Sequence, residues 1–318
     1  MATAAVVLGA GGIVGAAYHA GVLTALAEAG FDARDAELLV GTSAGSAVAA
    51  TLRAGFPPLD LAPRSLGQPI SAAAAALVGN AIGPPTFDFR PTSLSRPPLP
   101  SSPRLLLHAA RYPTKALAGL LPTGTVQTDA IAERIDHLYG GREWPQNPLW
   151  ICTVDLGSGD RVVFGRDAAT APIGTAVQAS SSIPGFFRPV DHDGRRYVDG
   201  GAHSPTNADV VMDTDFDIVV IVSPMSATTA GQRVARPNAR TLHARRLAGE
   251  VRRIRSSGTP VLTFQPTPAD IAVMGRNAMD PSRREATTNT SLTTARTRLA
   301  DPSVADRLEI LRRVPSRS

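Results

Sequence analysis

Four continuous runs of apolar residues, each bounded by glycine, proline or polar residues, form the strongest pattern along the chain. They lie near residues 4–9, 36–41, 149–156 and 216–224. Continuous runs, unlike alternating ones, are typical of strands covered on both faces of a parallel sheet. Shorter runs predict two more strands, one at 161–165 as a hairpin partner of 151–156 and one at 195–199.

Helical patterns alternate with these strands. They span 15–29, 44–54, 126–138, 239–256 and 291–313. In 239–256 the spacing places apolar residues on one side and arginines on the other, and the apolar residues are Leu242, Leu247, Val251 and Ile254. Residues 265–290 look like a loop. The β-α-β order predicts an α/β fold, a three-layer α/β/α sandwich with a mainly parallel central sheet.

Residues 56–125 depart from this order, because they hold 13 of the 27 prolines. We expect a Pro-rich helical insertion, either an irregular surface excursion or an apolar cap over a lipid-sized pocket. Residues 1–225 are expected to form one domain that includes this insertion. Residues 226–318 are expected to form a basic, mainly helical part that packs on the same domain.

The charge is distributed unevenly. Residues 1–230 have 15 basic against 20 acidic side chains, a net of −5, and residues 231–318 have 17 against 7, a net of +10. This basic part predicts either a solvated surface or peripheral contact with an anionic membrane surface. No nucleic acid is expected, because aromatic residues make up 5% of the chain and do not interleave with the arginines.

A single cysteine, Cys152, excludes an internal disulfide and, within its apolar strand, is expected to be an inert core residue. No apolar run approaches about 18 residues, so no transmembrane helix is expected. The N-terminal run lacks the basic residues that open a signal peptide. We therefore predict a cytoplasmic protein, with or without peripheral membrane contact.

The sequence Gly41-Thr-Ser43-Ala-Gly45 follows an apolar run and precedes a helix-forming run. A serine between a strand and a helix must leave the strand sharply, and flanking glycines remove the side chains that would clash there. The helix N-terminus would favour negative charge developing beside the hydroxyl. The alternative is an ordinary glycine-flanked loop, but the flanking patterns favour Ser43 as a nucleophile.

The glycine-rich turn over 8–23, "LGAGGIVGAAYHAGVL", lies between the first strand and a helix. It could bind a dinucleotide, since Gly9 and Gly11 fit that fingerprint, although Val14 stands where its third glycine belongs. It could instead form an oxyanion hole in which the amides of Gly11 and Gly12 face a substrate carbonyl.

Asp199 ends a short strand and precedes two glycines in "RRYVDGG". Alone, this sequence indicates a turn at a strand end, for which Asp-Gly is an ordinary choice. Beside the two other motifs, Asp199 becomes a candidate base for Ser43.

These motifs resemble the patatin-like phospholipase family in content and order. The glycine-rich loop is 10–15, the Gly-x-Ser-x-Gly sequence is 41–45 and the Asp-Gly-Gly sequence is 199–201, preceded by a similar Ala-Ser-to-Pro stretch within 178–190. The resemblance implies a patatin-like catalytic domain and a lipid ester substrate. It also implies a Ser-Asp dyad that needs no cofactor and no metal, in which Ser43 attacks the ester and Asp199 takes its proton.

By the same resemblance, the oxyanion hole is assigned to Gly11, Gly12 and Ile13. The elbow and motif glycines are Gly15, Gly41, Gly45, Gly200 and Gly201. Two positions depart from the family loop Gly-Gly-Gly-x-Arg/Lys-Gly, since Ala10 replaces its first glycine and Val14 its basic residue. These departures leave open a catalytically weak lipid-binding protein of the same fold.

The six histidines are expected in surface or packing roles, because neither His192 nor His243 lies in a convincing catalytic loop and His203 only approaches the pocket rim. The acidic run that includes Asp213, Asp215 and Asp217 lacks the glycine-centred loop of a calcium site. It is expected to be a solvated connector.

Overall fold

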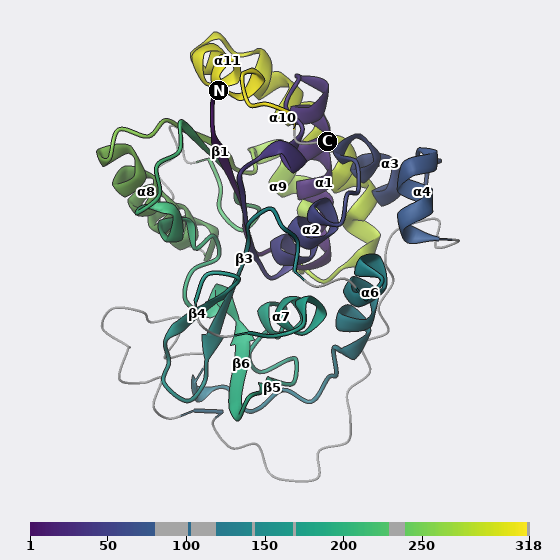
Figure 1. Cartoon of the computed structure of the whole chain (residues 1–318), viewed down its shortest axis with the longest axis vertical. Coiled ribbons are helices and arrows are strands. Elements are labelled where there is room, and N and C mark those ends of the chain that lie inside the picture. Colours follow the sequence, from purple (N-terminus) through teal and green to yellow (C-terminus); the bar gives the residue numbers. More distant parts are fainter. Residues whose placement is uncertain (80–100, 103–118, 142–143, 168–169, 229–238, 317–318) are drawn as a thin grey trace.

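The computed structural model describes residues 1–79, 101–102, 119–141, 144–167, 170–228 and 239–316. Within these residues, one sheet of eight strands forms the centre of the molecule (Figure 1). The strands are β1 Ala4–Leu8, β2 Leu38–Thr42, β3 Leu149–Asp155, β4 Arg161–Phe164, β5 Val190–His192, β6 Arg195–Asp199, β7 Ile218–Val222 and β8 Val261–Phe264. Their order is β5-β6-β3-β2-β1-β7-β8, and β4 also pairs with β3.

The sheet is mainly parallel, as predicted. Strands β3, β2, β1, β7 and β8 pair in parallel, whereas β4 and β6 run antiparallel to β3 and β5 runs antiparallel to β6. Parallel neighbours bring their carboxyl ends to one edge of the sheet, where open α/β sheets bind ligands. The turns after β1 and β2 therefore lie side by side at this edge.

Helices cover both faces of the sheet (Figure 1). They are α1 Gly12–Glu28, α2 Ala44–Arg53, α3 Leu61–Ser65, α4 Ala72–Val78, α6 Asp129–Tyr139, α7 Ile173–Ser180, α8 Ala239–Ser256, α9 Pro268–Met274, α10 Arg284–Ala300 and α11 Ala305–Arg312. Alternate side chains of β1 point to opposite faces. Val6 packs among α1, α2 and α10 residues, whereas Val7 packs with α8 residues such as Leu247. This arrangement confirms the three-layer α/β/α fold.

Residues 226–318 contribute to the same layers. Strand β8 extends the sheet beside β7, and α10 lies along α1. The sequence did not predict β8. The loop expected over 265–290 is wrong in part, because it contains α9 and the start of α10.

The single helix expected over 291–313 is divided. Helix α10 ends at Ala300, and Asp301 has an extended ψ of 125°. Proline restricts the residue before it to extended conformations, so Pro302 ends the helix and α11 begins only at Ala305. The position predicted for Leu242 is also wrong, because its side chain is 56% exposed while Leu247 and Ile254 are buried.

The insertion is described in part. Its first half forms α3 and α4, with Ser71 capping α4 by accepting from the amide of Ala74. Residues 80–100 and 103–118 lie outside the described residues. The cap over a pocket therefore stays a prediction.

Candidate active site

Ser43 stands alone between β2, which ends at Thr42, and α2, which begins at Ala44. Its φ of 54° and ψ of −124° lie in a region that side chains with a Cβ rarely adopt. A strained residue at a strand-to-helix turn is the geometry of a nucleophile elbow. The turn directs Ser43 to the carboxyl edge of the sheet, at the N-terminus of α2.

The two glycines that flank Ser43 are required by close packing. A Cβ on Gly41 would lie against the Cα of Ser46, and a Cβ on Gly45 would lie against the carbonyl oxygen of Leu8 in β1. No larger residue fits either place. The spacing of the Gly-x-Ser-x-Gly sequence is thus explained by backbone contacts on both sides of the turn.

Hydrogen bonds hold the backbone of the elbow. The amide of Ser43 donates to Oγ of Ser180 at 2.9 Å, and that hydroxyl donates to the carbonyl of Cys152 in β3 at 2.7 Å. Oγ of Ser46 donates to the carbonyl of Ser43 at 2.6 Å. These bonds leave the Ser43 side chain as the group that faces the pocket.

Asp199 ends β6 directly beside β3 and meets Ser43. The Ser43 hydroxyl lies close enough to this carboxylate to lower its pKa, and the Gly201 amide donates to Oδ1 at 2.7 Å. Burial raises the pKa of Asp199 to about 6, against the lowering effect of these two neighbouring donors. Asp199 is therefore ionised at neutral pH and basic enough to accept a proton from Ser43.

The turn after β1 leaves three amides open. Within the described residues, the N–H groups of Gly11, Gly12 and Ile13 have no acceptor in the chain, whereas that of Val14 donates to the Ala278 carbonyl at 3.0 Å. The first amides of a helix have no partner inside it, so they are available to an anion. Gly12 has a φ of +60°, and a Cβ there would lie 2.7 Å from the Ala278 carbonyl oxygen.

His19 fixes the base of this turn from within α1. Its side chain is fully buried, and Nε2 donates to the carbonyl of Gly9 at 2.7 Å. Burial lowers the pKa of His19 to about 4, so the ring is neutral and its proton stays on Nε2. No sequence motif marks this role, because a histidine in the middle of an apolar helix resembles ordinary core packing.

The two departures from the family loop are compatible with this geometry. Ala10 is not among the residues with positive φ, and its amide donates to the Pro205 carbonyl at 2.7 Å, so the backbone does not require glycine there. Val14 is buried with an exposed fraction of 2%. The backbone amide of Val14 links α1 to the Ala278 carbonyl, and this bond does not depend on a basic side chain at position 14.

A buried polar network lies behind the dyad. Nδ2 of Asn207 donates to Oγ1 of Thr42 at 3.1 Å and to the carbonyl of Gly200 at 3.2 Å, so one side chain ties the residue before Ser43 to the residue after Asp199. Glu250 of α8 accepts from the hydroxyls of Ser204 and Thr206. Sequence reasoning missed both Asn207 and Glu250.

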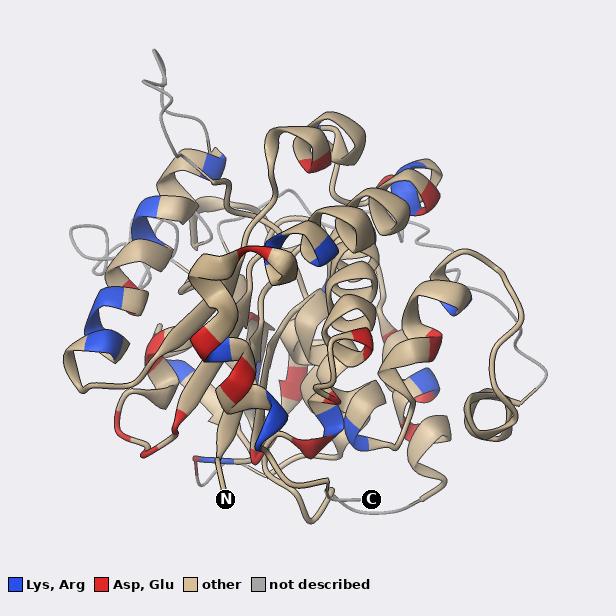
Figure 2. Cartoon of the chain, turned by 90° about the horizontal axis from the view of Figure 1, so that it is seen from above, with Lys and Arg blue, Asp and Glu red and all other residues tan. Residues whose placement is uncertain are grey.

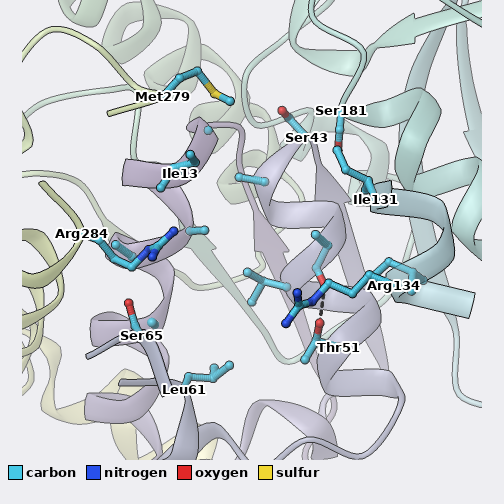
Figure 3. Close-up of a pocket in the computed structure, with 18 of the residues that line it drawn as sticks. Ile13, Ser43, Thr51, Leu61, Ser65, Ile131, Arg134, Ser181, Met279 and Arg284 are labelled. Atoms are coloured by element: carbon cyan, nitrogen blue, oxygen red, sulfur yellow. Dashed lines mark hydrogen bonds between the residues drawn. The ribbon is translucent and has the colours of Figure 1, made fainter. Parts of the chain in front are cut away.

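Ser43 lies in the wall of a mostly apolar pocket between α1 and α2 (Figure 3). Small side chains of the two helices form its sides, namely Ala16, Ala17, Ala20, Ala44, Ala47 and Val48. Ile131 and Ile135 of α6 close another side. An apolar pocket that begins at a serine hydroxyl suits an acyl chain.

The remaining candidates lie apart from these groups. Nε2 of His192 donates to the carbonyl oxygen of Thr170 at 2.6 Å, and Asp217 accepts from the Thr3 amide. Burial raises the pKa of the Cys152 thiol to about 12, which suits an inert residue.

Among the described residues, no three His, Cys, Asp or Glu side chains form a cluster suited to a metal. None of the helices in those residues has the length and apolar character needed to cross a bilayer.

Comparisons with known proteins agree with the motifs. A model of the family described as patatin-like phospholipase matches residues 6–212. Uncharacterized NTE family proteins of Mycobacterium bovis and Mycobacterium tuberculosis are 29% identical over 117 residues, which is 36% of this chain and 31% of theirs. The match thus spans about a third of the length of these curated relatives. The crystal structure of VipD from Legionella pneumophila aligns with 94% of this chain and 66% of that one, at 13% identity and a TM-score of 0.44.

Proposed function

The chain belongs to the patatin-like phospholipase family, and we propose that it is a serine hydrolase of lipid esters that works through a Ser43–Asp199 dyad. The observation that carries the proposal is the contact between the strained, pocket-facing Ser43 and the buried carboxylate of Asp199. Phospholipids and lysophospholipids are the proposed substrates. The expected product is a free fatty acid.

In the first half of the reaction, Oγ of Ser43 attacks the ester carbonyl carbon while Asp199 accepts the hydroxyl proton. The carbonyl oxygen becomes an oxyanion, which the amides of Gly11, Gly12 and Ile13 and the N-terminus of α2 would stabilise. The C–O bond of the ester then breaks, and the leaving alcohol takes the proton from Asp199. An acyl-enzyme remains on Ser43.

In the second half, Asp199 accepts a proton from water, and the resulting hydroxide attacks the acyl carbonyl. The bond to Oγ breaks, and Ser43 recovers its proton from Asp199. A base with a pKa near 6 can both take and return the proton at neutral pH. The reaction therefore needs no histidine.

The test of the dyad is covalent labelling with a fluorophosphonate, together with hydrolysis of a chromogenic short-chain ester. Ser43→Ala is expected to abolish the label and to lower kcat by about 10³-fold or more. Ser181→Ala is the matched control, because Ser181 lines the same pocket and is expected to leave labelling intact. A label that persists in Ser43→Ala would overturn the proposal.

Two other sequence hypotheses receive less support. A lipid-binding protein without turnover was suggested by Ala10 and Val14, yet both fit the loop without disturbing its open amides. It predicts binding to vesicles with no fluorophosphonate label. A dinucleotide-binding oxidoreductase predicts that NADH fluorescence changes when the protein is added. Membership of the patatin-like family favours the hydrolase over this alternative.

Contact with anionic membranes is proposed separately from the catalytic site. Helix α8 carries a row of basic residues (Figure 2), and Arg245, Arg252, Arg253 and Leu242 are exposed. This helix covers the sheet face opposite α1 and α2, so it would anchor the protein without delivering lipid directly to Ser43. Flotation with phosphatidylserine vesicles tests it. A cytoplasmic location stays a prediction from the sequence.

A further inference from the structure

Two arginines line the apolar pocket far from Ser43. Arg64 comes from α3 and Arg134 from α6, and both border the pocket near Leu61 and Leu138. Figure 3 shows Ser43 near one end of the pocket, Thr51 of α2 and Arg134 of α6 toward the other end, and Arg284 of α10 on the opposite wall. Cationic groups in such surroundings are unusual, because burying a charge is costly unless it is paired.

These two arginines lack an acidic partner among the described residues. Arg64 is only 7% exposed, and its Nε is buried without a hydrogen-bond acceptor. Burial and the neighbouring Arg134 lower the pKa of Arg64 to about 10, and burial lowers the pKa of Arg134. No carboxylate in the part of the chain that the structure describes counteracts either shift, so an anion entering here would meet uncompensated positive charge.

The local aromatic contact does not replace an anion. The guanidinium of Arg64 stacks over the Phe56 ring, 5.0 Å from its centroid. A cation–π contact orients the guanidinium but leaves its charge and its donors available. Asp60, one turn earlier, instead accepts from the amide and hydroxyl of Ser71.

The distance from the nucleophile sets the length of the ligand. Thr51 lies eight residues beyond Ser43 along α2, which is about 12 Å at about 1.5 Å per residue. Between them the wall is made of Ala44, Ala47 and Val48. An extended hydrocarbon of about eight to ten carbons spans this length, since C–C bonds of about 1.5 Å advance roughly 1.25 Å each.

We propose that Arg64 and Arg134 form a subsite for an anionic group, so that the preferred ester has an acyl chain of about ten carbons ending in a carboxylate or phosphate. This inference rests on the proposed function for the direction of the chain, with the ester carbonyl at Ser43. In a phospholipid the anionic group that reaches this subsite would stand at the far end of the acyl chain, because the glycerol phosphate lies only a few bonds from the ester carbonyl at Ser43.

Binding can be measured without turnover in the Ser43→Ala protein. The probes are monomethyl decanedioate, the matching ester with a terminal phosphonate, and neutral methyl decanoate, each followed by titration calorimetry. At least one anionic probe is expected to bind about tenfold more tightly than the neutral one. The stronger of the two anionic probes identifies the group as carboxylate or phosphate, and equal binding of all three would overturn the subsite.

The arginines are tested by Arg64→Met and Arg134→Met, which keep apolar volume and remove the charge. Each is expected to reduce the preference for the anionic probe about tenfold, whereas Arg252→Met on the exposed face of α8 keeps it. An unchanged preference in both pocket variants would overturn the inference.

Kinetics then separate this inference from the proposed function. In the protein with Ser43 intact, the ratio of kcat/KM for p-nitrophenyl esters of decanedioic and decanoic acid is expected to exceed about ten and to fall in the two pocket variants. Absence of turnover with the binding preference preserved would reject the hydrolase alone. Turnover with no preference would reject the subsite alone.

Discussion

Two glycine-rich turns stand side by side at the edge of the sheet, yet they place opposite chemistry there. Strands β1 and β2 pair with Leu8 opposite Gly41, and each is followed at once by a helix. After β1, the residue with positive φ is Gly12, and the turn offers amides. After β2, the residue with positive φ is Ser43, and the turn offers a hydroxyl.

The difference shows that similar glycine content serves two purposes. In the first turn, glycine permits a backbone conformation and leaves N–H groups uncovered, as at Gly12. In the second, Gly41 and Gly45 make room for neighbouring backbone, and the strain falls on the serine. The turns also touch, because Gly45 packs against the Leu8 carbonyl, so the nucleophile is placed relative to the open amides by direct contact.

The largest effect is expected from Gly45→Ala, which breaks the contact between the turns. Its Cβ would overlap the Leu8 carbonyl and lie 2.8 Å from the Gly9 carbonyl oxygen, and both are backbone atoms that cannot rotate away. We expect the free energy of unfolding in urea to fall by about 4 kcal/mol or more. Gly249→Ala is the control: it has open space in α8 and should gain about 0.5–1 kcal/mol. A normal urea midpoint for Gly45→Ala would contradict the packing argument.

Asp199→Asn comes next and removes the base from the second turn. We expect kcat to fall about 10³-fold. In the unmodified protein kcat/KM should rise with pH through about 6, as Asp199 ionises. A variant that keeps most of its activity would show that another group takes the Ser43 proton.

The same substitution should stabilise the protein. Burial raises the folded pKa of Asp199 from 3.8 to about 6, so the unfolded chain releases its proton first and stability falls as pH rises from about 4 to 6. Asp199→Asn removes this penalty, which is of the order of 3 kcal/mol at pH 8. Urea unfolding at pH 8 and pH 4 should show a gain that shrinks at the lower pH. Equal gains at both would point to a different cause.

The sequence predicted the parts of the fold that depend on local pattern. The apolar runs that became β1, β2, β3 and β7 are continuous, and their alternation with helices fixed the fold class. Strand β8 was missed because its four residues follow a polar turn and are too few for a period. The break between α10 and α11 was missed although Pro302 marks it.

The candidate site divides in the same way. Sequence motifs predict Ser43, Asp199 and the amides of residues 11–13 as site groups, and the structure brings them to one edge of the sheet. No motif predicts the roles of Asn207 and Glu250, because their contacts connect residues that are far apart in the sequence. Glu250 also lies in an arginine-rich helix that resembles a surface helix. The sequence likewise does not predict that Arg64 and Arg134 line the same pocket, because α3 and α6 come together only in the folded chain.

Gly12→Ala tests the first turn. The positive φ and the contact of the new Cβ with the Ala278 carbonyl would shift the amides, so we expect kcat to fall about 10²-fold, with stability reduced by about 1–3 kcal/mol. Gly275→Ala has the same kind of φ, +68°, but only the flexible end of Arg283 nearby. It should lose stability and keep its activity. If both variants lose activity equally, backbone strain rather than the oxyanion hole explains the effect.

The smallest effect is expected from His19, which acts on the first turn only through the Gly9 carbonyl. His19→Leu removes the donor and leaves that carbonyl buried without a partner, which should cost about 1–3 kcal/mol of stability and roughly tenfold in kcat as the open amides move. His19→Gln offers an amide N–H at nearly the same place and should recover most of kcat. Measuring kcat and KM separately is decisive, because a positioning role predicts a change in kcat at nearly constant KM. If His19→Leu loses stability but keeps its kcat, His19 only fills the core, and the first turn keeps its amides in place without it.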